Sequence, residues 1–171
     1  MIAPTLNTPR LTLRAHRIED FEDYAALWGS DDARLMGGPL GRDAAWGAFS
    51  SDIAAWVLFG FGGWAVQRKD DGAHIGQVGL NKLPSFAETE LGWLAYPQHR
   101  GNGYITEAAR AALDFAFNTA GMKTLVSYVE TENTASIRVA EALGAIPDEV
   151  AARPDPSDIV YRHAPAKETL S

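Results

Sequence analysis

Alternation of apolar and polar residues is the first pattern visible along the chain, and it predicts a protein rich in strands. Strands are predicted at residues 10–15, 63–68, 74–82, 88–96, 124–129 and 159–163, with one more near the prolines of residues 147–156. Alternation with a period of two is typical of half-buried strands, because successive side chains point to opposite faces of a sheet. Asp70-Asp71-Gly72 is a turn signal and predicts a hairpin between the second and third strands.

Apolar residues at helical spacing predict four helices among these strands. The first begins at Asp20, which could cap it, and the second at about Asp43, while the others cover residues 104–118 and 133–143. Gly144 ends the last helix. Residues 30–43 combine an acidic pair with Gly-Gly-Pro and are predicted to form a loop.

The order of these elements, βααβββαβαββ, predicts a fold of the α/β class with a mixed sheet of the α+β kind. A run of antiparallel strands comes before one strand–helix–strand crossover, and helices should pack on the sheet. The strand ending near Tyr96 and the strand starting near Thr124 should be parallel neighbours, joined by the helix over 104–118. Ligands in such sheets bind beyond the carboxyl ends of the parallel strands.

A glycine-rich turn lies at that place. Residues 98–104 read Gln-His-Arg-Gly-Asn-Gly-Tyr and lead directly into the predicted helix. Gly101 and Gly103 tolerate positive φ and leave room for a ligand beside the main chain. The first N–H groups of a helix lack partners within it, and the helix dipole and Arg100 add positive potential. The turn therefore predicts an anion site suited to a pyrophosphate.

Two other phosphate loops fit this turn poorly. The Walker-type run G-x-x-x-x-G-K-[ST] of nucleoside triphosphatases does not occur in the sequence. A dinucleotide loop, G-x-G-x-x-G, would need a glycine where Thr106 stands, and it should follow the first strand of the fold. Here the glycines come only after several predicted strands.

The spacing Gln98-x-x-Gly101-x-Gly103 instead resembles the [Q/R]-x-x-G-x-[G/A] signature of the GNAT superfamily of N-acetyltransferases. Other segments resemble its branch of ribosomal-protein N-terminal acetyltransferases, in the same order along the chain. They are residues 9–14, Glu90-Leu91-Gly92-Trp93, residues 103–108, and Asn133-x-x-Ser136 followed by residues 139–144. The resemblance runs from about residue 9 to residue 163, and the chain, residues 1–171, is predicted to be one GNAT domain.

The resemblance implies acetyl-CoA as the acyl donor, no metal, and a set of residues that hold the donor. In GNAT proteins the two parallel strands splay apart, and the pantetheine arm fills the gap and bonds to the earlier strand. Carried onto this chain, the contact residues are Leu94, Ala95, Tyr96, Arg100, Gly101, Asn102, Gly103, Tyr104, Asn133 and Ser136. For Asn133 and Ser136 the alternative is helix capping, since both types favour helix starts.

Acetyl transfer from a thioester needs a neutral amine, a donor for the developing oxyanion and a proton for the departing thiolate. Backbone N–H groups near Leu94 and Ala95 are the predicted oxyanion donors. In the ribosomal branch the serine that matches Ser136 is the proposed partner of the thiol. Glu90, on the strand lining the cleft, is the predicted base or proton relay, and its alternative is a solvated carboxylate or a salt bridge.

Several other side chains are weaker candidates. Glu88 lies two residues from Glu90 and should project to the same face. Of the four histidines, His74 is expected to be exposed, and His16 and His163 are expected to be peripheral. His99 is expected to lie too far from the thioester. Three phenols either donate a proton or pack around the sheet: Tyr96, Tyr104 and Tyr128. Trp46 or Trp56, on a helix expected to form the acceptor-side wall, is a candidate for the substrate pocket.

Composition narrows the function classes. The absence of cysteine excludes a disulfide, a thiolate metal site and a cysteine nucleophile. The net charge of −7 argues against nonspecific nucleic-acid binding, which depends on Lys and Arg. No secretory signal or membrane-spanning apolar stretch is visible, so a cytoplasmic protein is expected. Residues 164–171 are predicted to be a disordered tail, and a homodimer is compatible with the sequence, which specifies no interface.

The predicted function is transfer of an acetyl group from acetyl-CoA to a primary amine, by direct attack in a ternary complex. The acceptor is predicted to be a protein N-terminus or an amine-bearing small molecule. One alternative is a non-catalytic acyl-CoA-binding domain, which would be insensitive to Glu90→Gln and Ser136→Ala. Another is a nucleotide-phosphate enzyme that binds ATP or NAD through the same turn, and the missing lysine and third glycine argue against it.

Overall fold

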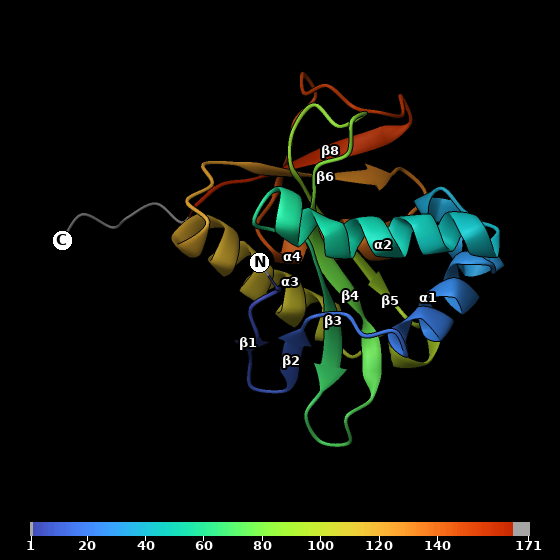
Figure 1. Cartoon of the computed structure of the whole chain (residues 1–171). Coiled ribbons are helices and arrows are strands. Elements are labelled where there is room, and N and C mark those ends of the chain that lie inside the picture. The colour runs from blue at the N-terminus through green and yellow to red at the C-terminus, as the bar shows by residue number, and fades with distance from the viewer. Residues whose placement is uncertain (1, 166–171) are drawn as a thin grey trace.

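The computed structural model describes residues 2–165, which form one mixed sheet with helices on both of its faces (Figure 1). Across the sheet the strands are β1 (Leu6–Asn7), β2 (Leu11–Arg14), β3 (Gly63–Arg68), β4 (His74–Asn81), β5 (Glu90–Ala95), β6 (Leu125–Glu130), β8 (Asp158–His163) and β7 (Ile146–Pro147). All neighbouring strands are antiparallel except β5 and β6. The predicted mixed sheet is therefore confirmed.

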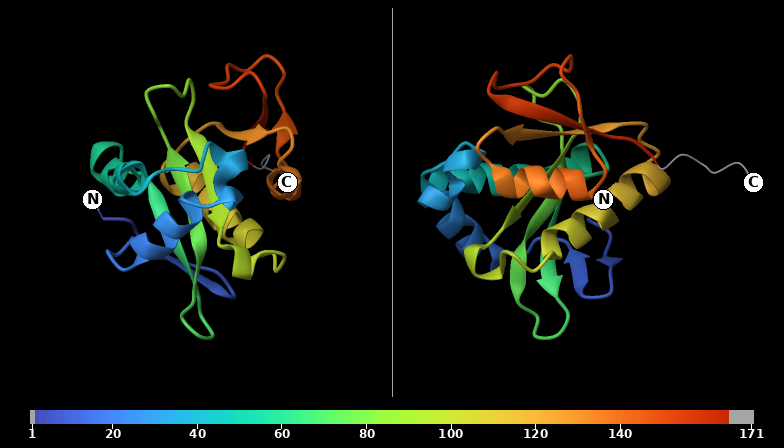
Figure 2. Two further views of the ribbon diagram at one scale, coloured as in Figure 1. Left: turned by 90° about the vertical axis from the view of Figure 1, so that its right-hand side faces the viewer. Right: turned by 180° about the vertical axis from the view of Figure 1, so that it is seen from behind.

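Helices cover the two faces of the sheet in pairs, as Figure 2 shows. On one face lie α1 (Asp20–Trp28) and α2 (Arg42–Leu58), and on the other α3 (Tyr104–Asp114) and α4 (Thr134–Ala142). A π-helical segment, η3 (Phe115–Thr119), continues α3, and two short 3-10 helices are η1 (Asp31–Met36) and η2 (Pro97–His99). The site described below lies between these layers.

The largest apolar core is packed where α3 meets the sheet. Its buried side chains include Trp64, Leu80 and Leu91 from the strands and the alanines of α3. These alanines recur at helical spacing, so α3 presents one apolar face to the sheet. A second buried cluster, around Tyr24 and Phe49, holds α1 and α2 against the other face.

The parallel strands β5 and β6 separate soon after they meet. Their only bridged pair in the described chain is Glu90 with Val126. One step further on, the Ser127 hydroxyl donates a hydrogen bond of 2.6 Å to the Leu91 carbonyl. Figure 1 shows β6 and β8 running across the molecule, crosswise to β3, β4 and β5. The predicted parallel pair and its splay are confirmed.

Several expected boundaries are wrong in detail. The predicted loop over 30–43 contains η1, and the two-residue strand β1 has no counterpart among the predicted strands. Asp20 is the first residue of α1 rather than its cap, and it accepts a hydrogen bond from the Arg17 N–H at 2.7 Å. The predicted disordered tail largely falls on residues 166–171, which lie outside the described residues. Within the described range, no helix combines the length and the apolar character needed to cross a membrane.

Candidate active site

The glycine turn leads into α3 with its backbone N–H groups open. Gly101 and Gly103 both have positive φ, 78° and 73°, and Gly103 stands at the helix start without a side-chain cap. A Cβ built on Gly101 would meet no atom within 4 Å. The first turn of α3 therefore offers unpaired donors and the positive end of the helix dipole to an anion.

Arg10, which the sequence did not single out, braces this turn from the start of β2. Its guanidinium donates to the Asn102 carbonyl at 3.1 Å and to the Glu107 carboxylate at 2.6 Å. It also packs over the Tyr104 ring, 4.6 Å from the ring centroid. More than ninety positions separate Arg10 from these partners, so no local sequence pattern could have revealed its role.

Arg100 lies at the edge of the turn rather than inside it. Its guanidinium donates to the Asp32 carboxylate at 2.6 Å and to the Ala95 carbonyl at 3.2 Å. Asp32 belongs to η1, so this half-exposed ion pair links the turn to the helix that replaced the predicted loop.

A groove of about 550 Å³ runs from the glycine turn along the end of β5 to α4. Its lining includes most of the predicted donor-binding residues: Leu94, Ala95, Arg100, Gly101, Asn102, Gly103, Tyr104, Asn133 and Ser136. Tyr96 is absent from the groove, because its side chain is buried and its N–H donates to the Ile75 carbonyl. The structure thus brings all of the predicted donor-binding residues except Tyr96 together along one groove.

The backbone of β5 turns alternate residues toward the gap. The Leu91 carbonyl faces β6, where it accepts from Ser127. Because strand hydrogen bonding alternates, Trp93 and Ala95 also direct their N–H and C=O groups to this side, whereas Leu94 faces β4. Of the N–H groups expected to act as oxyanion donors, that of Ala95 therefore faces the gap together with that of Trp93, and that of Leu94 does not.

Asn133 and Ser136 lie at the start of α4, opposite β5. The Asn133 side chain accepts from the Ser136 N–H at 3.1 Å, so the capping alternative is realised for Asn133. The Trp93 indole N–H donates to the Ser136 hydroxyl at 3.3 Å. Ser136 uses only its oxygen in that bond, and its own hydrogen stays available to an acceptor in the groove.

A second cavity, of about 410 Å³, lies between the sheet and the layer of α1, α2 and η1. It shares six lining residues with the groove, at the place where β5 and β6 separate: Leu35, Met36, Trp93, Leu94, Asn133 and Ser136. A long molecule in the groove would thus have its end in contact with a small molecule in the cavity. Such an arrangement suits a transfer reaction between two substrates.

Glu90 faces this second cavity. Its carboxylate accepts from the Asn81 side-chain amide at 2.9 Å. Burial raises the pKa of Glu90 to about 7, and the bond from Asn81 only partly opposes the shift. A carboxyl group with a pKa near neutrality can take up and release a proton, as a general base must.

The sequence model of the family described as "Acetyltransferase (GNAT) domain" matches residues 10–146. The chain belongs to this GNAT family. Its curated relatives include the uncharacterized protein YkkB of Bacillus subtilis, 36% identical over 88 residues, a match that spans about half of each protein. The uncharacterized N-acetyltransferase YoaA, also from B. subtilis, is 28% identical over 82% of each chain.

Solved structures agree with this membership. An acetyltransferase from Agrobacterium tumefaciens has a TM-score of 0.92 and 45% sequence identity, over 95% of each chain. Spermidine N-acetyltransferase from Vibrio cholerae, solved with CoA and spermine, has a TM-score of 0.70 over 91% of this chain and 94% of its own. At 19% identity it shows the fold alone. This protein is thus a GNAT N-acetyltransferase, in a family that uses acetyl-CoA.

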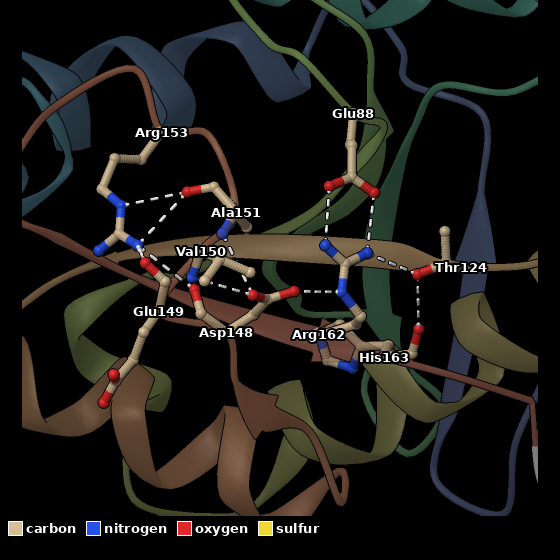
Figure 3. Close-up of polar contacts among 9 residues, drawn as sticks. All are labelled: Glu88, Thr124, Asp148, Glu149, Val150, Ala151, Arg153, Arg162 and His163. Carbon is tan, nitrogen blue, oxygen red and sulfur yellow. Dashed lines mark hydrogen bonds and ion pairs between the residues drawn. The ribbon is translucent and has the colours of Figure 1, made fainter.

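Glu88 does not join Glu90 in the GNAT site, contrary to the expectation of a shared face. It precedes β5, and its carboxylate receives two hydrogen bonds of 2.8 Å from Arg162 (Figure 3). Arg162 also donates to Asp148 at 2.6 Å, so it ties the segment before β5 to β8 and to the loop after β7. This ion pair keeps the pKa of Glu88 below its usual value. Glu88 therefore has a structural role.

The histidine and tryptophan expectations also need correction. His16 and His163 are buried rather than peripheral, and burial lowers the pKa of each to about 4. His74 is largely buried and lies beside Asp20 and Asp23, away from both cavities. Trp46 is half-exposed and Trp56 is in the main core, and the tryptophans that line the second cavity are Trp28 and Trp93.

Of the three phenols singled out in the sequence, only Tyr128 lines the second cavity, and its buried hydroxyl has no hydrogen-bond partner within the described residues. Asp52, on α2, is a cavity carboxylate that sequence reasoning missed. The described residues contain no group of three or more side chains that could hold a metal ion.

Proposed function

We propose that this GNAT protein transfers an acetyl group from acetyl-CoA to a primary amine, on a small molecule or a protein N-terminus, by direct attack in a ternary complex. The observation that carries the proposal is the meeting of the groove and the second cavity at Trp93, Leu94 and Ser136. The groove would hold the acyl donor, and the cavity, which contains Glu90, would hold the acceptor.

The residues of the groove suit the parts of acetyl-CoA. The N–H groups of the turn from Gly101 to Tyr104 would bind the pyrophosphate, with Asn102 and Arg100 at its side. The backbone of Trp93 and Ala95 would hold the pantetheine arm in the gap between β5 and β6. When bound, acetyl-CoA supplies the acetyl group as a thioester.

Four residues would then carry the transfer. Glu90 takes a proton from the entering ammonium group, which leaves a neutral amine with a free lone pair. N–H groups of β5, at Trp93 and Ala95, donate to the carbonyl oxygen as the amine nitrogen bonds to the carbonyl carbon. As the C–S bond breaks, Ser136 passes a proton to the sulfur and receives one from the new amide nitrogen.

The class of acceptor is the finer part of the proposal. The motifs at residues 9–14 and 133–144 support the ribosomal N-terminal branch, whose acceptor is a protein N-terminus. The name of the V. cholerae neighbour is that of an enzyme for a small amine, spermidine. The cavity volume of about 410 Å³ is within the range of small-molecule sites and favours a small amine.

A thermal-shift titration with acetyl-CoA, CoA, ATP and NAD, followed by an acetylation screen over amines and N-terminal peptides, tests this proposal. Acetyl-CoA and CoA alone should raise the melting temperature, since a ligand at about 100 times its dissociation constant stabilises a fold by about 2.7 kcal/mol. A shift with ATP or NAD instead would favour the nucleotide-enzyme alternative. Binding of acetyl-CoA without acetylation of any amine would favour the non-catalytic acyl-CoA-binding domain.

A further inference from the structure

The sheet face that carries the acceptor cavity is built from rows of residues across β3, β4 and β5, and the cavity lies against the part formed by β4 and β5. Gly63, Gly79 and Gly92 lie side by side in one row. On one flank is the pair of Gln77 and Leu94, and on the other the pair of Asn81 and Glu90. Paired residues of antiparallel strands point to the same face, and side chains of the two flanks fold over this glycine row.

A carboxylate folds over each end of this glycine row. At one end, a Cβ built on Gly92 would lie 3.2 Å from a Glu90 carboxylate oxygen. At the other end, a Cβ built on Gly63 would lie 3.0 Å from the Asp52 Cβ. Two strand spacings, about 10 Å, separate the two glycines, so the two carboxylates approach the row from opposite ends.

Asp52 is fixed in place by Gln77, whose amide N–H donates to it at 2.6 Å. Gln77 is itself buried, 7% exposed, and its other side-chain atom, Oε1, has no hydrogen-bond partner within the described residues. A buried acceptor without a partner destabilises the fold unless a ligand or water satisfies it. Asp52 and Gln77 Oε1 together thus present acceptors to a group that donates hydrogen bonds.

The charges around the cavity all have one sign. Asp52, Glu90 and Glu130 line it, and no Lys, Arg or His is among its described lining residues. Glu130 binds its own turn, through the Glu132 N–H at 2.7 Å, and so is the least available of the three. Burial raises the pKa of Asp52 to about 6, and the charge of Asp52 contributes to the raised pKa of Glu90. Two positively charged groups in the cavity would favour the ionised form of both carboxylates.

We propose that Asp52, held by Gln77, binds a second positively charged group of the acceptor, so that the acceptor is a small molecule with two basic groups. This inference rests on the proposed function, since it places the reacting amine at Glu90. The second amine stays protonated and donates to Asp52 and to Gln77 Oε1. A protein N-terminus, with its single α-amine, fills only one of these two positions.

Calorimetry on the CoA-bound protein tests the inference without requiring turnover. The probes are α,ω-diamines from propane to hexane, each compared with the monoamine of the same chain length. The diamine of best length should bind at least about tenfold more tightly than its monoamine, because a charge-assisted hydrogen bond is added. In Asp52→Asn this advantage should fall to about twofold or less, while CoA affinity stays unchanged.

Asp43→Asn is the matched control, because it removes the same charge from the exposed first turn of the same helix. It should keep the full preference for diamines. The inference is overturned if no diamine binds more tightly than its monoamine, or if the preference survives in Asp52→Asn. The wild-type comparison needs no variant, so misfolding of Asp52→Asn would not leave the inference open.

Acetylation assays on the same compounds separate this inference from the proposed function. If diamines bind with the expected preference but are not acetylated, the proposed function fails and the recognition by Asp52 stands. If amines are acetylated without regard to a second charge, the proposed function stands and the role of Asp52 falls.

Discussion

The groove proposed for the donor and the cavity proposed for the acceptor meet at the same residues, yet one is formed mainly by backbone and the other by side chains. The groove is made of backbone: the N–H groups of the turn at 101–104, the start of α3 and the open edge of β5. The chemistry of the cavity comes from side chains, chiefly Asp52 on α2, Gln77 on β4 and Glu90 on β5. A site made of contiguous backbone can be identified from a local motif, whereas one assembled from distant side chains cannot.

The two regions should also respond differently to pH. Backbone N–H groups do not titrate, so binding in the groove depends little on protons of the protein. The cavity holds carboxyl groups whose pKa values burial raises to about 6 for Asp52 and about 7 for Glu90. Chemistry in the cavity should therefore change across the neutral range, while donor binding should not.

Glu90→Gln should damage the cavity while the groove stays intact. We expect kcat to fall by about 100- to 1,000-fold, since a general base contributes that much or more. The dissociation constant of acetyl-CoA should be unchanged. Wild-type kcat should rise with pH through about 7 as Glu90 ionises, and the variant should lose this rise. Steady-state kinetics across pH, with calorimetry for the donor, measure both effects.

Glu88→Gln is the control for that variant, because it neutralises a carboxylate two residues away that pairs with Arg162 instead of lining the cavity. It should keep the wild-type pH profile of kcat. An equal loss in both variants would indicate a general electrostatic effect and would remove the role of Glu90 as base.

Stability should change in the opposite direction from activity in Glu90→Gln. The folded protein binds the Glu90 proton more tightly than the unfolded chain, so the burial penalty grows as pH rises from about 4.5 to about 7. At pH 8 the variant should therefore be more stable, by about 3 kcal/mol, and at pH 4 the two proteins should be alike. Thermal melts at both pH values check the sign.

Gly103→Val should damage the groove while the cavity stays intact. Valine at φ 73° strains the helix start and places a side chain where the anion must approach. Losing one charge-assisted hydrogen bond weakens acetyl-CoA binding by roughly 10- to 100-fold, measured by calorimetry. Gly121→Val is the matched control, since Gly121 has a φ of 68° and open surroundings outside the groove. A wild-type affinity in Gly103→Val would refute the assignment of the turn.

Arg100→Glu should have the smallest effect of the three, because the guanidinium is half-exposed and already paired with Asp32. Replacing an attraction with a repulsion at the surface should weaken acetyl-CoA binding by about fivefold to tenfold at low salt, and by less at high salt. Asp32→Asn should have the opposite sign, because it frees Arg100 for the pyrophosphate. Calorimetry of both variants at two salt concentrations measures these effects. Acetyl-CoA affinities that equal the wild-type value and do not change with salt would exclude a role for Arg100.

Local sequence determined most of the elements of this GNAT protein and the groove proposed for the donor. Period-two alternation and helical spacing identify most strands and helices, because burial on one face of an element leaves its period in the sequence. Gly101 and Gly103 predict an anion site, since positive φ and close approach to the backbone are requirements of the turn itself.

Tertiary structure alone decided the cavity and its partners. Asp52 meets Gln77 across 25 positions and Arg10 meets Asn102 across 92, distances over which no periodicity carries information. The raised pKa of Glu90 is likewise a property of its surroundings, because the burial that causes the shift arises only when the sheet and the helices pack together. Local pattern specifies what a segment can become, and packing decides which side chains become neighbours and how they ionise.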